Sequence, residues 1–285
     1  MPDSAILPSE ASSWQRWAMT LSTAGSLVRT AHPGPAAAVT VLTLVIAVGM
    51  DADPDTVMVL GTAVLSGQLV VGWTNDLLDR TRDQVAGRTD KPLVTGRISV
   101  TAVRRAVGMA SATCVVASLL CGLVAGLLHL ALVGAALAYN AGLKSTVWSW
   151  LPYALAFGGL PAVVSLALDP AQIPPLWMVV AGALFGIAAH LLNVMPDLAA
   201  DAATGVRGLP HRLGTRTIRI IAALTLVAAS ATVFLGTGNP ATVWHRVLLG
   251  AVLVLAALTV RAPNRTPFYA AIAVAGVNGM MLLLE

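Results

Sequence analysis

Long apolar runs separated by polar connectors dominate the chain. Two connectors, at residues 76–99 and 196–216, are long and charged. Several of the others are short and rich in Asp, Pro or Gly, which is typical of turns. The runs that are long enough to cross a bilayer fall near residues 34–50, 56–75, 100–123, 126–142, 151–168, 176–195, 217–236, 243–261 and 267–284. This pattern predicts an all-α polytopic membrane protein with about nine transmembrane helices.

The composition supports this interpretation. Hydrophobic residues make up 57% of the 285 residues and charged residues only 11%, whereas a soluble domain carries about 25% charged residues. Unpaired backbone amides are costly in lipid, so the spanning segments must be helices. The first residues are more polar and lack the apolar core of a signal peptide. We therefore expect an N-terminal cytoplasmic or interfacial segment at 1–33 and one transmembrane domain at 34–285.

Basic residues lie almost entirely on one side of the predicted topology. Nine spans place alternate connectors on opposite sides, and of the 17 Lys and Arg residues only Arg246 falls on the second side. An excess of positive charge marks the cytoplasmic side. We therefore expect a multi-pass protein of a bacterial plasma membrane, with its N-terminus and both long connectors in the cytoplasm. The pI of about 9.6 reflects this asymmetry. It does not indicate nucleic-acid binding, because the sequence has no soluble basic stretch with interleaved aromatic residues.

A cluster of acids opens the first long connector. Asp76, Asp79 and Asp83 are spaced three and four residues apart, which places them on one face of a helix. Three carboxylates so close together repel one another. They either pair with Arg80 and Arg82 in solvent or hold a divalent cation among them.

A second segment repeats this arrangement. The shared skeleton is Asn, Asp, Asp and Gly, each four residues apart, at Asn75, Asp79, Asp83 and Gly87 and again at Asn193, Asp197, Asp201 and Gly205. The two copies end the second and sixth predicted spans, so both open toward the cytoplasm. A solvated run of charges is not expected to recur with the same skeleton and topology. The repeat therefore favours a binding site.

Two facing acidic helix ends suit a complex of Mg²⁺ and diphosphate. Mg²⁺ takes oxygen ligands and typically combines one or two carboxylates with phosphate oxygens. The candidate metal ligands and catalytic residues are Asp76, Asp79, Asp83, Asp197 and Asp201. Nearby basic residues would neutralise the diphosphate. Alternatively, each of them is a loop charge that sets the orientation of the protein in the membrane. They are Arg88, Lys91, Lys144, Arg207 and Arg212.

The apolar remainder of the chain indicates what the diphosphate carries. An apolar tail attached to it would lie between the spans, and such a molecule is a prenyl diphosphate. Metal ions stabilise diphosphate as a leaving group. The allylic C–O bond can then ionise, and the resulting carbocation needs a dry cavity because water would trap it.

The sequence resembles the UbiA superfamily of intramembrane prenyltransferases. NDLLDRTRD, at 75–83, matches the family signature NDxxDxxxD. The flanking GQLVVGWTND and RTDKPLVTGRIS are also similar to the family. DLAAD, at 197–201, together with the LPHRLG that follows, resembles the second family motif, DxxxD. The resemblance extends from about Arg29 to the ninth span.

This resemblance implies a fold, a cofactor and roles for particular residues. The fold is a ring of nine transmembrane helices around a lipid-open cavity, and the activity is an Mg²⁺-dependent transfer of an alkyl or aryl group other than methyl. Asn75, Asp76, Asp79 and Asp83 would bind one part of the Mg²⁺–diphosphate complex, and Asp197 and Asp201 the other. Some members use a Tyr and a Lys after the fourth span, which Tyr139 and Lys144 match. Lys91 stands where many members have Arg, and Gly208 where Thr is common.

Two further polar residues face the same side as Asp197. Asn193 is a candidate to contact the substrate or orient a ligand water. His190 is more typical of a histidine that packs between helices than of one that contacts an acceptor, but an ionisable group this close to the site is a candidate.

Four functions are compatible with these features. The one best supported is prenyl transfer to an aromatic, quinone-precursor or other lipophilic acceptor, with membrane lipid around the protein and no nucleic acid as partner. Cyclisation of a prenyl diphosphate is the main alternative and would use cavity aromatics to stabilise cations. Transfer between a polyprenyl phosphate and a sugar donor is a third. Ion-coupled transport is less consistent, because transporters place acids near the bilayer midplane and commonly have inverted repeats.

Overall fold

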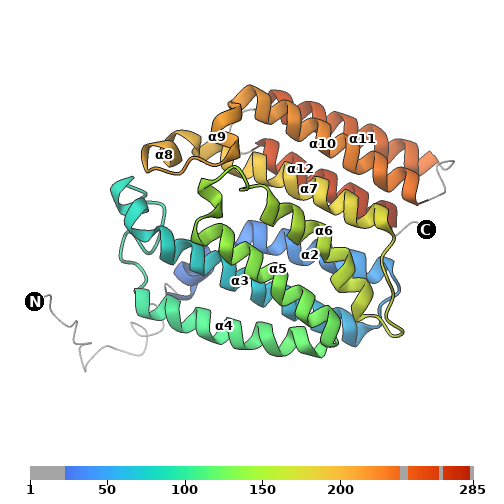
Figure 1. Ribbon diagram of the computed structural model, residues 1–285, viewed down its shortest axis with the longest axis horizontal. Helices are drawn as coiled ribbons and strands as arrows, with labels where there is room; N and C mark the ends of the chain where they lie inside the picture. Colours follow the sequence, from blue (N-terminus) through green and yellow to red (C-terminus); the bar gives the residue numbers. More distant parts are fainter. Residues whose placement is uncertain (1–22, 238–242, 263–265, 283–285) are drawn as a thin grey trace, which may run out of the picture.

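The chain folds into a bundle of helices (Figure 1). The computed structural model describes residues 23–237, 243–262 and 266–282, and all regular structure in these ranges is helical. The longer elements are α2 (Pro33–Gly49), α3 (Pro54–Val85), α4 (Val100–Leu120), α5 (Leu123–Ala141), α6 (Leu151–Ala167), α7 (Leu176–Val194), α10 (Thr215–Gly236), α11 (Val243–Arg261) and α12 (Thr266–Leu282). The short ones are α1 (Thr23–Thr30), η1 (Leu143–Ser145), η2 (Met195–Asp197), α8 (Leu198–Ala203) and α9 (Leu209–Leu213).

Each predicted apolar run coincides with one of the longer helices in the described ranges. By length and composition, five helices are sufficient to cross a membrane, or six if α1 and α2, which meet at 66°, form one span. The protein is therefore an all-α, multi-pass membrane protein, while the number of nine spans remains a prediction. Most of the predicted N-terminal segment, residues 1–22, lies outside the described residues.

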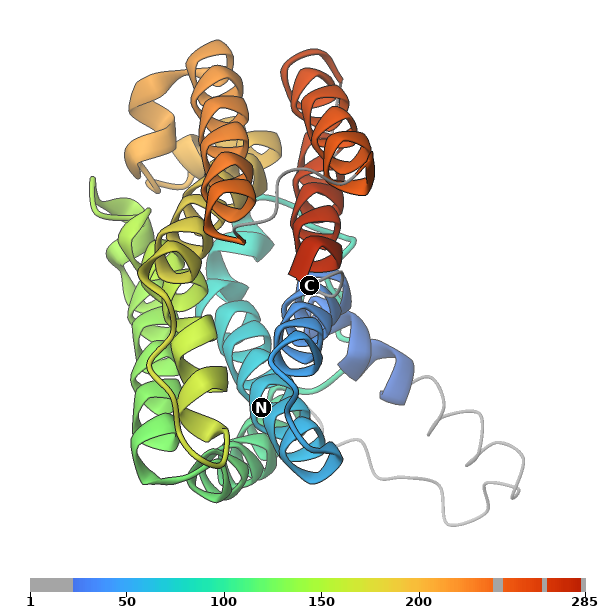
Figure 2. The same ribbon diagram turned by 90° about the vertical axis from the view of Figure 1, so that its right-hand side faces the viewer.

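The longer helices form a closed ring. Neighbours in sequence pack against each other from α2 to α7, α7 continues to α10, and α12 returns to contact α2. Figure 2 shows the helices following one another around the molecule, with α12 beside α2. Close packing of α6 on α7 depends on glycine, because a Cβ at Gly186 would collide with the carbonyl oxygen of Tyr153.

The helix that carries the first acidic segment is longer than the sequence analysis expected. We predicted a connector from residue 76, but α3 continues to Val85. Asp53 is the N-cap residue of α3, and its carboxylate accepts hydrogen bonds from two backbone N–H groups of the first turn. The three carboxylates can lie within this helix because basic side chains from other segments neutralise their charge, as described below.

The repeated glycine has a structural explanation. Gly87 and Gly205 both have positive φ, at 65° and 86°, and each follows the last residue of a helix end. The N–H of the next residue then donates to the carbonyl of the last acid in the motif, Asp83 or Asp201, at 3.0 and 2.9 Å. This is the Schellman arrangement, in which glycine is favoured because it tolerates the left-handed backbone. Both copies of the repeat therefore end their helices in the same way.

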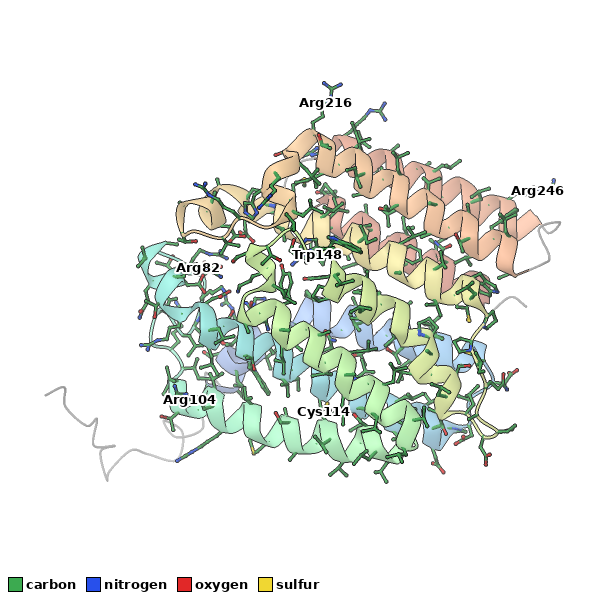
Figure 3. The ribbon with its side chains drawn as sticks, viewed as in Figure 1. Arg82, Arg104, Cys114, Trp148, Arg216 and Arg246 are labelled. Carbon is green, nitrogen blue, oxygen red and sulfur yellow. The ribbon has the colours of Figure 1, made fainter. Side chains whose placement is uncertain are left out.

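The two acidic segments lie at the same end of the bundle. Figure 1 shows the C-terminal end of α3 beside α8 and α9, which follow α7. Figure 3 places Arg82 at this end and Arg246 at the opposite end of the molecule. These two arginines, which the predicted topology assigns to opposite sides, thus lie at opposite ends of the bundle, and the orientation in the membrane stays a prediction.

Candidate active site

A cavity of about 470 Å³ extends from the two acidic segments into the bundle. Its walls combine a polar end with a long apolar part. The polar end includes Asn75, Asp79, Asp83, Arg88, Lys91, Tyr139, Lys144, Asn193, Asp197 and Asp201. The apolar part includes Val39, Leu42, Leu132, Phe157, Leu160, Phe185 and Ile272. Most of the residues that sequence reasoning selected are thus brought together around one space.

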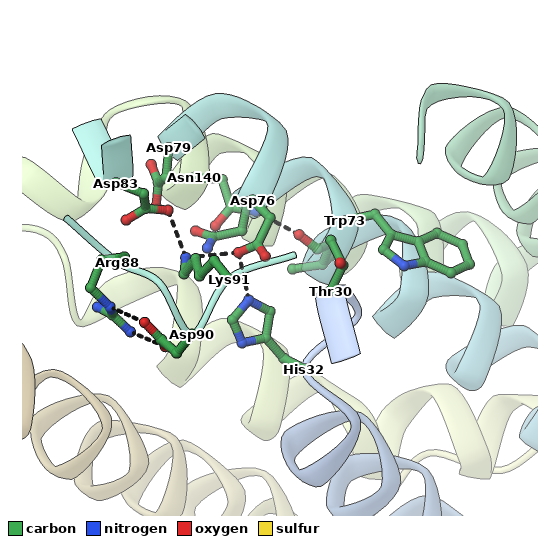
Figure 4. A network of polar contacts seen from close by, with 12 residues as sticks. Thr30, His32, Trp73, Asp76, Asp79, Asp83, Arg88, Asp90, Lys91 and Asn140 are labelled. Carbon is green, nitrogen blue, oxygen red and sulfur yellow. Dashed lines mark hydrogen bonds and ion pairs between the residues drawn. The ribbon is translucent and has the colours of Figure 1, made fainter. Parts of the chain in front are cut away.

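The first acidic segment lies on one buried face of α3, as its spacing predicted. Asp76, Asp79 and Asp83 are exposed by only 2%, 8% and 7%. Lys91 returns from the following connector and places its Nζ 2.8 Å from a carboxylate oxygen of Asp76 and 2.8 Å from one of Asp83 (Figure 4). Burial opposes the charged form of Lys91, but the two carboxylates outweigh it and raise its pKa above the ordinary value.

A second lysine neutralises the remaining acid of this segment. The Nζ of Lys144, in η1, lies 2.6 Å from Asp79 Oδ1, and an Nη atom of Arg82 lies 2.6 Å from the same oxygen. Lys144 also donates to the side-chain oxygen of Asn75 at 3.5 Å. Burial lowers the pKa of Lys144, and the attraction of Asp79 offsets this only in part. Lys144 therefore lies next to the acids, while the contact with diphosphate that the resemblance implies stays a prediction.

His32 is a contact that sequence reasoning missed. Its Nε2 lies 2.9 Å from Asp76 Oδ1, the same oxygen that Lys91 contacts. The residue precedes α2 in a left-handed conformation, with φ of 53°. It is far from the motif in the sequence, and nothing in the local pattern distinguishes it from an ordinary helix boundary.

The second acidic segment is organised differently. Pro196 has no backbone N–H to continue the helix of α7, and the chain forms the 3₁₀ turn η2 before α8. The side chains of Asp197 and Asp201 are 35% and 27% exposed. The helix thus tightens for three residues between α7 and α8, so Asn193, Asp197 and Asp201 do not lie on the regular α-helical face that their spacing predicted, although all three line the cavity.

Arg88 links the two segments. Its Nη1 lies 3.5 Å from Asp197 Oδ1, while two other nitrogens donate to Asp90 at 2.9 and 3.0 Å. These charge-assisted bonds lower the pKa of Asp90 to about 2. Arg88 is thus held by Asp90 in the space between the first and second motifs.

His211 is a second residue that sequence reasoning missed. Its side chain is only 7% exposed, and its Nε2 lies 4.0 Å from Asp201 Oδ2. Both ring nitrogens are buried without a hydrogen-bond partner. The only sequence signal was its place in the LPHRLG segment that follows the second motif.

Aromatic rings surround the polar end on the side of α6 and α7. Tyr139 and Tyr153 pack edge to face at 5.3 Å between centroids, and both contact the ring of His190. His190 is 1% exposed, and its Nε2 lies 3.0 Å from the hydroxyl of Ser149. Asn193 donates to the hydroxyl of Tyr153 at 3.2 Å. The packing role that we favoured for His190 agrees with these contacts.

Three selected residues lie apart from the cavity surface. Asp76 is enclosed behind Lys91 and does not line the cavity. Arg207 and Arg212 are exposed and also do not line it. Their predicted contact with a diphosphate therefore remains a prediction that the geometry of the cavity does not support directly.

The donor set fits Mg²⁺ in chemistry. Asp79, Asp83, Asp197 and Asp201 present carboxylate oxygens to the same cavity, and oxygen is the ligand atom that Mg²⁺ prefers. Within the described residues, however, no group of three acidic, His or Cys side chains is already close enough to enclose a metal ion. The carboxylates are instead satisfied by Lys91, Lys144 and arginines.

Comparison with known proteins identifies the fold. The chain is similar to an apo UbiA homologue from Aeropyrum pernix K1, with a TM-score of 0.70, 19% identity, and 92% of this chain and 99% of that one covered. It is similar to a UbiA homologue from Archaeoglobus fulgidus bound to GPP and Mg²⁺, with a TM-score of 0.66, 17% identity, and 91% and 100% covered. A digeranylgeranylglyceryl phosphate synthase matches with a TM-score of 0.61, 16% identity, and 92% and 96% covered.

The family itself is shown by the sequence. A search of curated protein sequences gives no match, but the model of the UbiA prenyltransferase family matches residues 36–277. This range includes both acidic segments and all the helices from α3 to α11. The chain belongs to the UbiA prenyltransferase family.

Proposed function

We propose that this protein transfers a prenyl group from a prenyl diphosphate to an aromatic, quinone-precursor or other lipophilic acceptor, with Mg²⁺ as cofactor and release of diphosphate. The observation that carries the proposal is that both acidic segments line one end of a cavity whose remainder is apolar. A related UbiA homologue of this fold is described as bound to GPP and Mg²⁺.

The polar end would hold the diphosphate. Asp79, Asp83, Asp197 and Asp201 would hold Mg²⁺, which when bound supplies the positive charge that stabilises a departing diphosphate. Lys91, Lys144 and Arg88 now contact these acids. When metal and diphosphate are present, the same cations lie within reach of phosphate oxygens, which lysine contacts as a point charge and arginine with a planar fork.

The apolar part would hold the tail and keep water away. Leu132, Leu160 and Phe185 line it, and water excluded from this space cannot trap an allylic cation. Tyr139 and Tyr153 lie where the polar and apolar parts meet, and their ring faces attract positive charge. This placement of rings is also the observation that favours the second candidate, cyclisation of the tail without an acceptor.

The experiment is an assay of the purified protein in nanodiscs with geranyl, farnesyl or geranylgeranyl diphosphate and no acceptor. We measure substrate binding and released diphosphate and analyse organic extracts, with and without Mg²⁺. Mg²⁺-dependent binding with little release supports transfer and leads to an acceptor screen. A cyclic hydrocarbon or terpene alcohol would establish cyclisation. If none of the three substrates binds in an Mg²⁺-dependent way, both candidate functions, prenyl transfer and cyclisation, are excluded.

We also propose that the polar end faces the cytoplasm of a bacterial cell. The support is the distribution of basic residues, with Arg246 at the opposite end of the bundle from Arg82. Single cysteines at Arg207 and Arg246, in a background without Cys114 and Cys121, test it. A membrane-impermeant thiol reagent added to intact cells should label the cysteine at 246 and not the one at 207. The reverse pattern would contradict the topology.

A further inference from the structure

The apolar part of the cavity contains one histidine whose role the proposed function leaves unexplained. His129 lies in α5, is 5% exposed and lines the cavity. Its ring faces α3 at Gly67, where an added Cβ would lie 3.4 Å from His129 Nε2. Gly67 precedes Asn75 on α3 by about 12 Å at 1.5 Å per residue. The histidine is therefore well removed from the diphosphate end.

The hydrogen bonds of Ser118 determine which nitrogen of His129 carries the proton. The hydroxyl of Ser118 donates to the carbonyl of Cys114 at 2.5 Å. Its oxygen is therefore free to accept, and His129 Nδ1 lies 2.7 Å from it. Nδ1 must then be the donor. An imidazolium buried without a carboxylate partner is unfavourable, so the ring is neutral and its single proton is on Nδ1.

The second nitrogen is consequently a hydrogen-bond acceptor. Within the described residues, no side chain or backbone donor bonds to His129 Nε2. The protein encloses Nδ1 of His190 completely and leaves it without a partner, whereas Nε2 of His129 is not enclosed in this way. Because His129 lines the cavity, a ligand there can reach Nε2. Gln68 adds a second polar group to the same wall.

We infer that His129 selects an elongated lipophilic acceptor that carries a hydroxyl at the end remote from its reacting atom. This inference rests on the proposed function, since it concerns the acceptor of the same cavity. A prenyl tail is a hydrocarbon and has no proton to donate. A donor at this depth therefore belongs to the second substrate. Ser118 and the carbonyl of Cys114 hold the ring in the tautomer that accepts from it.

The test uses a matched pair of probes, 4-octylphenol and 4-octylanisole, which differ by the presence of a donor hydroxyl. Binding to the protein in nanodiscs is measured by calorimetry, with empty nanodiscs subtracted. The wild type should bind the phenol about fivefold more tightly, as expected for one hydrogen bond in an apolar cavity. In His129→Leu the preference should fall below about twofold.

Two further variants make the result decisive. Ser118→Ala removes the group that fixes the tautomer and should also reduce the preference, and it decides the question if His129→Leu does not fold. His190→Phe is the matched control, because His190 lines the same cavity but its unpartnered Nδ1 is fully enclosed by the protein and its Nε2 bonds with Ser149. It should keep the preference. The inference would be overturned if the wild type bound the two probes equally. It would also be overturned if the preference survived in both His129→Leu and Ser118→Ala, or if it were lost in His190→Phe.

The same samples separate this inference from the proposed function. Mg²⁺-dependent binding of inorganic diphosphate, which has no tail, should change less than twofold in His129→Leu, because the diphosphate lies at the other end of the cavity. Loss of the phenol preference with retained diphosphate binding supports the inference. If the wild type binds no diphosphate, the proposed function fails, and the probe pair still decides the role of His129.

Discussion

The two acidic segments share one sequence skeleton but differ in structure. In the first, α3 runs without interruption through Asp83, and all three acids are buried against Lys91 and Lys144. In the second, the helix breaks at Pro196, and the acids are about one-third exposed. Among the contacts described above, Asp197 has Arg88 at 3.5 Å and Asp201 has His211 at 4.0 Å. Both segments end in the same Schellman arrangement. The difference in burial and helix continuity therefore arises within the motifs and not at their C-terminal ends.

This comparison separates structural and adaptable parts of one site. Buried acids paired with lysines form a fixed framework, since an unpaired buried charge is strongly unfavourable. Half-exposed acids beyond a helix break can change partners at small cost. We therefore expect the first segment to contribute to stability as well as to binding, and the second mainly to binding.

The largest effects should come from removing one charge in each segment. Asp197→Asn should reduce turnover roughly 100- to 1000-fold by weakening the metal and diphosphate site. Asp76→Asn should reduce it by a similar factor, because Asp76 holds Lys91 beside Asp83. Only Asp76→Asn should also destabilise the fold, by about 3 kcal/mol, because it leaves Lys91 and His32 beside a neutral group. Thermal unfolding in detergent measures this difference. Equal losses of stability would contradict the distinction between the segments.

Substitution of the bridging lysine should separate metal binding from catalysis. Lys91→Met leaves the carboxylates of Asp76 and Asp83 without their shared cation. Without diphosphate, Mn²⁺ used as a paramagnetic substitute should bind about tenfold more tightly, because Lys91 no longer competes for the acids. Turnover should nevertheless fall, since a phosphate contact is lost. Unchanged Mn²⁺ affinity would show that Lys91 and the metal do not share these oxygens.

Restoring the helix in the second segment should have a moderate effect. Pro196→Ala supplies the missing N–H and permits α7 to continue into α8, which moves Asp197 relative to Asp79. We expect turnover to fall about tenfold while the unfolding temperature stays equal or rises. Pro54→Ala, at the start of α3 and the far end of the bundle, is the control. A Pro196→Ala protein with full activity would mean that the break is not needed.

The smallest effects should follow substitution of the exposed arginines. Arg207→Ala and Arg212→Ala should each change the Michaelis constant for the diphosphate less than about threefold, because neither lines the cavity. Arg88→Ala should raise it about tenfold or more, because Arg88 lies between the motifs. Steady-state kinetics with farnesyl diphosphate distinguish these outcomes. A larger effect of Arg207→Ala would indicate that the second connector closes over the substrate.

Several features of the site could be predicted from the sequence. The spacing of Asp76, Asp79 and Asp83 predicted a common helix face, and the structure places them on one buried face of α3. The repeat predicted that Asp79 and Asp197 belong to one site, and both line the cavity. The contacts of His32 and His211 could not be predicted, because each depends on how separate segments meet. The break at Pro196 has a local cause that the spacing argument did not take into account.

The sequence by itself determined the class of the protein, since apolar length, paired motifs and charge bias are local properties of the chain. It also determined which carboxylates gather at one end. Only the tertiary structure decided which acids are enclosed, which cation each one contacts, and that His129 lines the cavity. These properties depend on distances between helices that are remote in sequence, and helical periodicity specifies a face but not the neighbour that covers it.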